Sequence, residues 1–107
     1  MRLVVNEINQ RASGGSYVVI YEATVEVLEE VGVAVEVVRV TPDDTDRALV
    51  ERARVAIARG AARALTPHSK GARIQVHSVV IPVVDFTPRR FEQFTCRAME
   101  RLLASAE

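Results

Sequence analysis

The stretch DTDRALVERARVAIARGAARALTPHSKGARIQVHSVVI, residues 44–81, decides the fold of this chain. In its first half, apolar and mostly small residues recur at the spacing of one helix face: Leu49, Ala53, Ala56, Ile57, Gly60, Ala61, Ala64 and Leu65. This spacing predicts a helix over residues 44–65. Residues 66–71 have the composition of a turn, and residues 72–81 alternate as a strand does. A helix, a turn and a long strand are therefore expected at the centre of the molecule.

Acidic residues mark the start of this helix. Asp43, Asp44 and Asp46 follow Pro42, and carboxylates suit the positive end of the helix dipole. We expect Asp43 or Asp44 to cap the first free backbone N–H groups, which explains the three aspartates more simply than a cation site. Gly60 lies inside the helix, where it costs about 1 kcal/mol relative to alanine. We therefore expect a close approach between the helix and a neighbouring backbone at this position.

The strand over residues 72–81 is expected to place alternate side chains on opposite faces of a sheet. One face is predicted to carry four residues: Ile74, Val76, Ser78 and Val80. The other face is predicted to carry the intervening four: Arg73, Gln75, His77 and Val79.

Three strands are predicted before this unit and one helix after it. The strands cover residues 2–9, 17–28 and 33–40, with a hairpin turn between the last two. Thr87 is a good N-cap and Pro88 a good first residue for a helix over residues 88–104. This helix is expected to bury five residues, with Met99 at the edge of the buried face: Phe91, Phe94, Thr95, Ala98 and Leu102.

The order strand-strand-strand-helix-strand-helix indicates a single domain over residues 1–107. Two amphipathic helices and a four-stranded sheet give an α+β fold, a two-layer sandwich with both helices on one sheet face. The opposite face then carries Val18, Ile20 and Leu28 among glutamates. Because an apolar patch on an uncovered face favours contact with a partner, we expect an interface there, with a homodimer as one form of it.

Composition limits the classes of function. The chain is 49% hydrophobic with a formal net charge of zero, whereas a protein that binds nucleic acid by charge alone is usually basic. The charge is nevertheless uneven, because residues 12–38 hold five glutamates and no basic residue, and residues 52–73 hold six basic residues and no acidic one. The single cysteine fits a reducing cytosol, and the sequence has no long apolar run and no signal-peptide pattern. We expect a cytoplasmic protein without a membrane segment.

No group of residues has the spacing of a catalytic or metal site. His68 and His77 are the only histidines, and neither has a second ligand nearby in sequence. Cys96 has no evident base beside it, as a catalytic thiolate needs. Residues 13–15, Ser-Gly-Gly, lie between two strands, which favours a hairpin loop over a phosphate nest ahead of a helix. We therefore predict no enzymatic activity, no metal and no cofactor.

Four segments follow one another in a recognisable pattern. Residues 11–17, RASGGSY, are similar to an Arg-Gln-Ser-Gly-Gly loop followed by a Tyr and a strand. Residues 56–65, AIARGAARAL, resemble a helix of the form Gly-Ile-x-x-Ala-x-x-x-Gly, and residues 71–76, GARIQV, resemble the Gly-x-Pro-Val strand that follows it. Val84, Asp85 and Phe91 are similar to a Val-Asp-Ser-Ser segment leading to Ala-Phe. Together these segments resemble domain IV of the translocating elongation factors, namely elongation factor G and its relatives, including the ribosome-protection proteins.

The resemblance implies the split βαβ fold with a left-handed crossover, also seen in a small-subunit ribosomal protein, although parallel crossovers are usually right-handed. In the family this domain reaches into the ribosomal decoding region with two loops at its tip. Residues 11–17 and 85–90 correspond to these loops here. The residues that the resemblance places at the contact tip are Arg11, Ser13, Gly14, Gly15, Arg89 and Arg90.

The chain also departs from the family. It contains no P-loop or other GTPase segment, so we expect no nucleotide binding. The first tip loop is short, and the second lacks a histidine-bearing extension and paired serines. Arg11, Arg89 and Arg90 can either contact phosphate, which the guanidinium group suits, or remain solvated. The expected function is a non-enzymatic module that binds RNA or the ribosome, and the alternative is an assembly module that self-associates through the uncovered sheet face.

Overall fold

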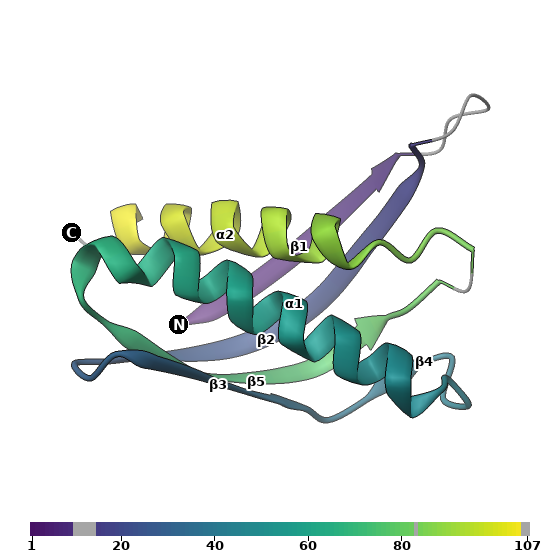
Figure 1. The fold of residues 1–107 in the computed structure, drawn as a ribbon, viewed down its shortest axis with the longest axis horizontal. Coiled ribbons are helices and arrows are strands. Elements are labelled where there is room, and N and C mark those ends of the chain that lie inside the picture. The colour runs from purple at the N-terminus through teal and green to yellow at the C-terminus, as the bar shows by residue number, and fades with distance from the viewer. Residues whose placement is uncertain (10–14, 83, 106–107) are drawn as a thin grey trace.

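A mixed sheet of five strands packs against two helices in the computed structural model, which describes residues 1–9, 15–82 and 84–105 (Figure 1). The elements are β1 (Arg2–Asn9), β2 (Tyr17–Leu28), β3 (Gly32–Val37), β4 (Val40–Thr41), α1 (Arg47–Leu65), a 3-10 turn (Thr66–His68), β5 (Gly71–Val80) and α2 (Pro88–Ser105). The predicted α+β sandwich, with both helices on one face of the sheet, is confirmed.

The sheet has the strand order β1-β2-β5-β3, with β4 also beside β5. β2 is antiparallel to both β1 and β5, whereas β3 and β4 run parallel to β5. A parallel pair needs a crossover, and α1 provides it. In Figure 1, β3 and β5 both run from left to right, α1 lies in front of the sheet, and β5 lies above β3. This arrangement makes the crossover left-handed, against the usual preference.

The third predicted strand, residues 33–40, is divided into β3 and β4, which is why the sheet has five strands rather than four. Both parts keep one register, because Val37 is opposite Val76 and Val40 is opposite Val79. Backbone hydrogen bonds continue across the gap, with Val38 N donating to Val76 O at 2.8 Å. The prediction of a single unbroken strand was therefore wrong, although the chain runs along β5 as expected.

Helix α1 begins at Arg47, three residues later than predicted. The backbone first turns at Pro42, whose carbonyl accepts hydrogen bonds from both the amide and the hydroxyl of Thr45. Asp46 is the N-cap, because its carboxylate accepts from Ala48 N at 2.7 Å. The prediction that Asp43 or Asp44 caps the helix was wrong, since both lie within the turn that precedes it.

Gly60 lies where α1 and α2 approach each other closely. A Cβ atom added there would lie 2.3 Å from the carbonyl oxygen of Glu92 and 2.8 Å from Cβ of Thr95. Both distances are far below a normal van der Waals contact, so only glycine fits without moving a helix. The expected close backbone approach is confirmed, and seven residues of the predicted apolar stripe are buried: Ala53, Ala56, Ile57, Gly60, Ala61, Ala64 and Leu65.

A β-bulge changes which side chains of β5 face the core. Ala23 of β2 is opposite Val76, but the preceding Glu22 is opposite Ser78, so His77 is an extra residue in β5. Beyond this point the alternation changes phase, and Val79 is 1% exposed. The prediction that Ser78 and Val80 share a face with Ile74 was therefore wrong, because simple alternation does not anticipate an inserted residue.

Helix α2 buries a slightly different set of residues from the one predicted. Phe91, Phe94 and Thr95 are buried as expected, but Met99 is fully buried rather than at the edge. Ala98 and Leu102 are only half-buried. The buried face therefore continues from Thr95 to Met99 along one side of the helix. Because Ala98, Met99 and Leu102 are all apolar, the sequence did not indicate which of them is buried most deeply.

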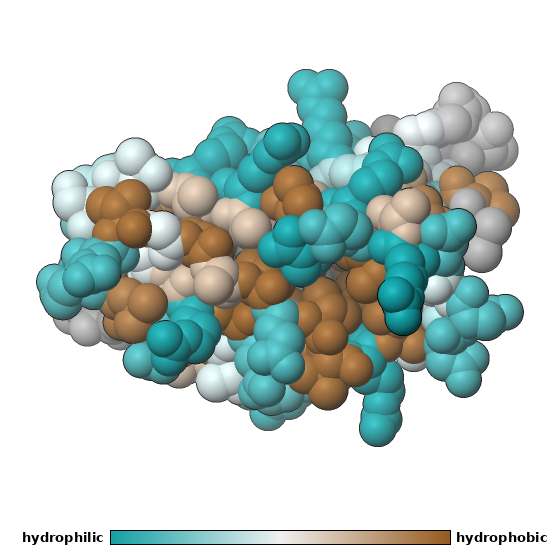
Figure 2. All heavy atoms as spheres, turned by 60° about the horizontal axis from the view of Figure 1, so that its bottom comes forward, coloured by the Kyte–Doolittle hydropathy of each residue, from teal (hydrophilic) through white to brown (hydrophobic). Residues whose placement is uncertain are grey.

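Hydrophobic side chains on the β3 side of the molecule pack against the core without being fully covered. They include five half-buried residues from β3, β4 and α1: Val33, Val37, Val40, Leu49 and Val50. When the lower side of Figure 1 is turned forward, hydrophobic side chains gather in the middle of the view and hydrophilic side chains surround them (Figure 2). The hydrophobic interior therefore reaches the surface on this side.

Candidate functional site

Three of the six predicted tip residues, Arg11, Ser13 and Gly14, lie outside the described residues. The other three, Gly15, Arg89 and Arg90, line one hollow of about 480 Å³. Ser16, Thr87 and Gln93 complete its lining. We call this the tip hollow. It brings the segment before β2 against the first turn of α2, two parts of the chain that are more than 70 residues apart.

The first turn of α2 positions the two arginines of the tip hollow. The carbonyl of Thr87 accepts hydrogen bonds from the amides of Arg90 and Phe91, at 3.0 and 3.2 Å, which begins the helix where the sequence predicted. The guanidinium carbon of Arg90 lies 4.9 Å from the centre of the Tyr17 ring, and Arg90 also donates to the amide oxygen of Gln93 at 3.1 Å. Arg90 is therefore held in one orientation.

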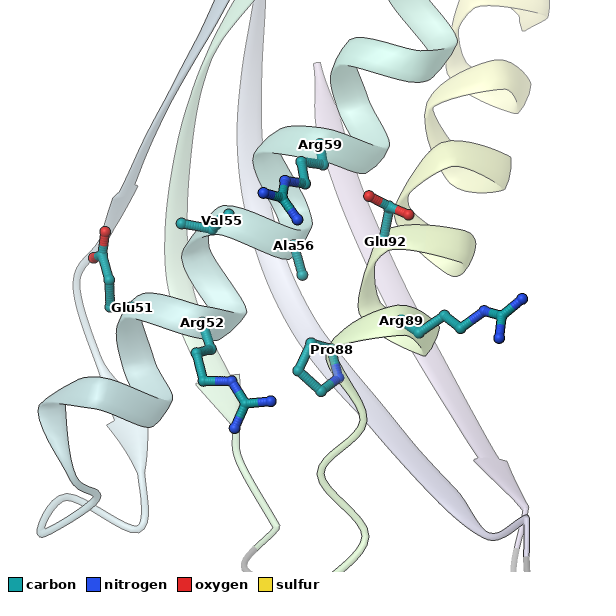
Figure 3. Close-up of a pocket in the computed structure, with 8 residues that line it drawn as sticks. All are labelled: Glu51, Arg52, Val55, Ala56, Arg59, Pro88, Arg89 and Glu92. Carbon is teal, nitrogen blue, oxygen red and sulfur yellow. The ribbon is translucent and has the colours of Figure 1, made fainter.

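A second hollow, of about 420 Å³, lies between α1 and the first turns of α2 (Figure 3). We call it the arginine groove. Eight residues line it: Glu51, Arg52, Val55, Ala56, Arg59, Pro88, Arg89 and Glu92. Arg89 belongs to both hollows, so the arginine groove and the tip hollow are adjacent. The sequence indicated a basic face on the central helix, but not that the start of α2 would close a groove against it.

Both carboxylates of the arginine groove are already paired with arginines outside it. Glu51 accepts two hydrogen bonds from Arg54, and these lower the pKa of Glu51. Glu92 lies 3.5 Å from the guanidinium of Arg63. Within the part of the chain that the structure describes, neither Arg59 nor Arg89 forms a salt bridge. The groove therefore presents more positive than negative charge to a ligand.

The two helices together are strongly basic. They hold nine arginines and three glutamates, although the whole chain has no formal net charge. On the uncovered face of the sheet, β2 and β3 contribute Glu22, Glu26 and Glu36. Arg2 and Arg73 lie on the same face and form salt bridges with Glu22 and Glu26, so this face is only weakly acidic. The charge asymmetry that the sequence indicated therefore comes mainly from the basic helical layer.

The uncovered sheet face carries an apolar patch at one end. Val18 pairs with Ile8, and Ile20 pairs with Val80, so these four side chains are neighbours on three adjacent strands. Val4 lies diagonally from Ile20, and Val4 and Ile8 are 56% and 57% exposed. We call these five residues the sheet patch.

The third predicted interface residue, Leu28, lies at the opposite end of the same face, where it pairs with Gly71. Polar and charged side chains of β2, including Thr24 and Glu26, separate Leu28 from Ile20. The three predicted interface residues therefore do not form one patch. Sequence reasoning missed Ile8, which alternation along β1 would have placed on this face.

His77 and Cys96 have structural surroundings, whereas His68 is exposed in the 3-10 turn. His77 forms a 2.6 Å hydrogen bond with the hydroxyl of Thr24 on the uncovered face. Burial raises the pKa of the Cys96 thiol, and a 3.2 Å hydrogen bond to Glu100 adds to this effect. A raised pKa disfavours the reactive thiolate. Among residues 1–9, 15–82 and 84–105, no three His, Cys, Asp or Glu side chains lie close enough to hold a metal ion.

The sequence matches none of the protein-family models and none of the curated proteins with which it was compared. Neither α1 nor α2 combines the length and the hydrophobicity that a membrane-spanning helix requires. Function is therefore inferred from the surfaces of the molecule, namely the tip hollow, the arginine groove and the sheet patch.

Proposed function

We propose that this chain is a non-enzymatic binding module, similar to domain IV of elongation factor G, whose tip binds the phosphates of RNA. The observation that carries the proposal is the tip hollow, where Gly15, Arg89 and Arg90 lie together. The resemblance makes the ribosome the expected source of the RNA. The single cysteine fits work in the reducing cytoplasm, where ribosomes act.

The chemistry of the tip hollow suits a phosphate group. Guanidinium groups bind phosphate oxygens through paired hydrogen bonds, and an arginine that is already oriented loses less freedom when it does so. Arg90 is oriented by Tyr17 and Gln93, and Arg89 is exposed. Gly15 has a φ angle of +77°, and no described residue lies within 4 Å of its Cβ position, so these residues leave its backbone open to a ligand.

The distribution of charge supports the same proposal. RNA is a polyanion, and its electric field turns a protein that has one strongly basic layer so that this layer faces the RNA. The nine arginines of α1 and α2 form such a layer, with the tip hollow at one end of it. Because the net charge is zero, the chain as a whole is not attracted strongly to every polyanion, but its basic layer can still contact RNA in one orientation.

The experiment compares two double variants for binding to purified small ribosomal subunits. Arg89→Ala/Arg90→Ala removes the tip arginines, and Arg97→Ala/Arg101→Ala removes the same charge from the other half of α2. We expect the first variant to weaken binding and to make the slope of log K against log salt shallower by about 1.4, since each contact to single-stranded phosphate contributes about 0.7. Equal binding by both variants would reject the proposal.

Self-association is a second candidate function, and the sheet patch favours it. Five apolar side chains on an uncovered sheet face lose contact with water when a second copy covers them. We expect a dimer whose sedimentation depends on concentration and which Ile20→Glu disrupts. Leu28→Glu is the matched control, since it adds the same charge at the far end of the same face. A strict monomer for the unmodified chain at high concentration would exclude this function.

A further inference from the structure

The arginine groove combines an apolar floor with positive charge at its rim. Figure 3 shows Ala56 of α1 pointing toward Pro88 of α2 between the two helices, with Arg52 and Arg59 projecting from α1 beside them, and we call these apolar residues the floor of the groove. Val55 adds a further apolar side chain. The guanidinium of Arg52 lies 5.8 Å from the centre of the Phe86 ring, which in turn packs edge-on against Phe91 at 5.4 Å. Arg52 is exposed, but its guanidinium lies over Phe86, which packs against the hydrophobic core.

An unpaired nucleotide has the chemistry that fits this groove. The face of a nucleotide's base is largely apolar, whereas its phosphate needs a positive partner. The floor offers apolar contact, and Arg59 offers a guanidinium group that no described carboxylate neutralises. A duplex fits less well, because its base faces are stacked on one another and cannot reach the floor.

The position of Arg89 links the arginine groove to the tip hollow. Arg89 lines both, and Figure 3 shows its side chain extending away from α1 on the far side of Pro88. We propose that single-stranded RNA bound at the tip continues past Arg89 into the arginine groove, where Arg52 and Arg59 contact its phosphates. This inference rests on the proposed function, because the tip hollow supplies the first contact.

The experiment measures binding of a fluorescent oligouridylate strand, and of the duplex that it forms with oligoadenylate, over a range of salt. Arg52→Ala/Arg59→Ala is compared with Arg97→Ala/Arg101→Ala, which removes equal charge from the helical layer outside the groove. We expect the groove variant to lose about tenfold in affinity for the single strand, with a salt slope shallower by about 1.4. The control variant should stay close to the unmodified chain.

A third variant tests the floor. Val55→Glu places a carboxylate among the apolar residues of the groove, and we expect it to weaken single-strand binding by about tenfold. Circular dichroism spectra and urea midpoints must show that each variant is folded. If poly-glutamate binds as strongly as RNA, the inference is wrong, because the groove then recognises negative charge alone and its apolar residues do not contribute to binding.

The outcomes separate the groove from the tip. If the groove variants bind as the unmodified chain does while Arg89→Ala/Arg90→Ala binds weakly, the tip alone holds RNA and the inference is wrong. If the duplex binds as tightly as the single strand, the apolar floor takes no part and the inference is also wrong. If the unmodified chain binds no RNA, both the inference and the proposed function are rejected.

Discussion

Tyr21 and Thr95 form a hydrogen bond of 2.5 Å in the interior, 74 residues apart in sequence. Burial raises the pKa of Tyr21 well above its usual range, so the phenol stays neutral. The bond joins β2 to α2, and both residues are buried, Tyr21 being 2% and Thr95 0% exposed. This hydrogen bond gives each of the two hydroxyl groups a partner, and either group would be costly to bury without one.

Replacing only one partner of this bond should cost more than replacing both. Tyr21→Phe leaves the Thr95 hydroxyl without that partner, and we expect a loss of about 1–3 kcal/mol in the free energy of unfolding. Tyr21→Phe/Thr95→Val should recover part of the loss, because neither polar group remains. Urea denaturation measures both values. A double variant that loses the full sum of the two single variants would contradict this account.

The cap of α1 gives a matched test among three aspartates. Asp46→Ala removes the carboxylate that accepts from Ala48 N, and we expect a loss of about 1 kcal/mol in stability. Asp43→Ala and Asp44→Ala remove the same charge from the preceding turn, where neither side chain caps the helix. Their urea midpoints should stay close to that of the unmodified chain. Equal losses in all three variants would mean that charge, and not capping, stabilises the helix.

At the scale of single residues, the sequence predicted the type of residue that caps the helix or lines the site, but not always its position in the chain. Three neighbouring aspartates all have capping chemistry, and only the turn that ends at Thr45 selects Asp46. The resemblance placed six residues at a contact tip, of which Gly15, Arg89 and Arg90 line one hollow, and their contact with a partner stays a prediction. Arg52 and Arg59 were visible only as members of a basic face, because their role depends on where α2 begins.

At the scale of elements, the crossing of α1 over α2 depends on one glycine. Gly60→Ala places a methyl group 2.3 Å from the carbonyl oxygen of Glu92, so the helices must move apart. We expect a loss of about 1–3 kcal/mol, as for other overpacked cores, although alanine favours the helix itself. Arg59→Ala, at the exposed neighbouring position, should change stability by less than about 0.5 kcal/mol. Unchanged or increased stability for Gly60→Ala would show that the helices separate without cost.

The bounds of β1 and β2 were predicted to the residue, and these two strands pair with each other without a register shift. The predictions failed where the pattern is interrupted. The extra residue His77 in β5 changes the phase of the strand, and the gap between β3 and β4 divides another. Periodicity describes regular elements, whereas a bulge depends on pairing with a strand that is distant in sequence.

At the scale of the whole molecule, the sandwich separates the two surfaces for which we propose different functions. The helical layer carries the tip hollow and the arginine groove, and the uncovered sheet face carries the sheet patch. Because the two layers lie on opposite sides, self-association and RNA binding should not compete. We expect Ile20→Glu to leave the affinity for single-stranded RNA unchanged, as measured by fluorescence anisotropy. A parallel loss of both properties would mean that RNA binding requires the dimer.

The most direct test of the central claim is the salt dependence of RNA binding by the unmodified chain. Affinity for a single-stranded RNA oligonucleotide is measured from about 50 to about 200 mM salt. Contacts from two or more arginines predict a slope of log K against log salt of about −1.4 or steeper, because each phosphate contact contributes about −0.7. A slope near zero, or no binding at the lowest salt, would contradict the proposal that this module recognises RNA phosphates.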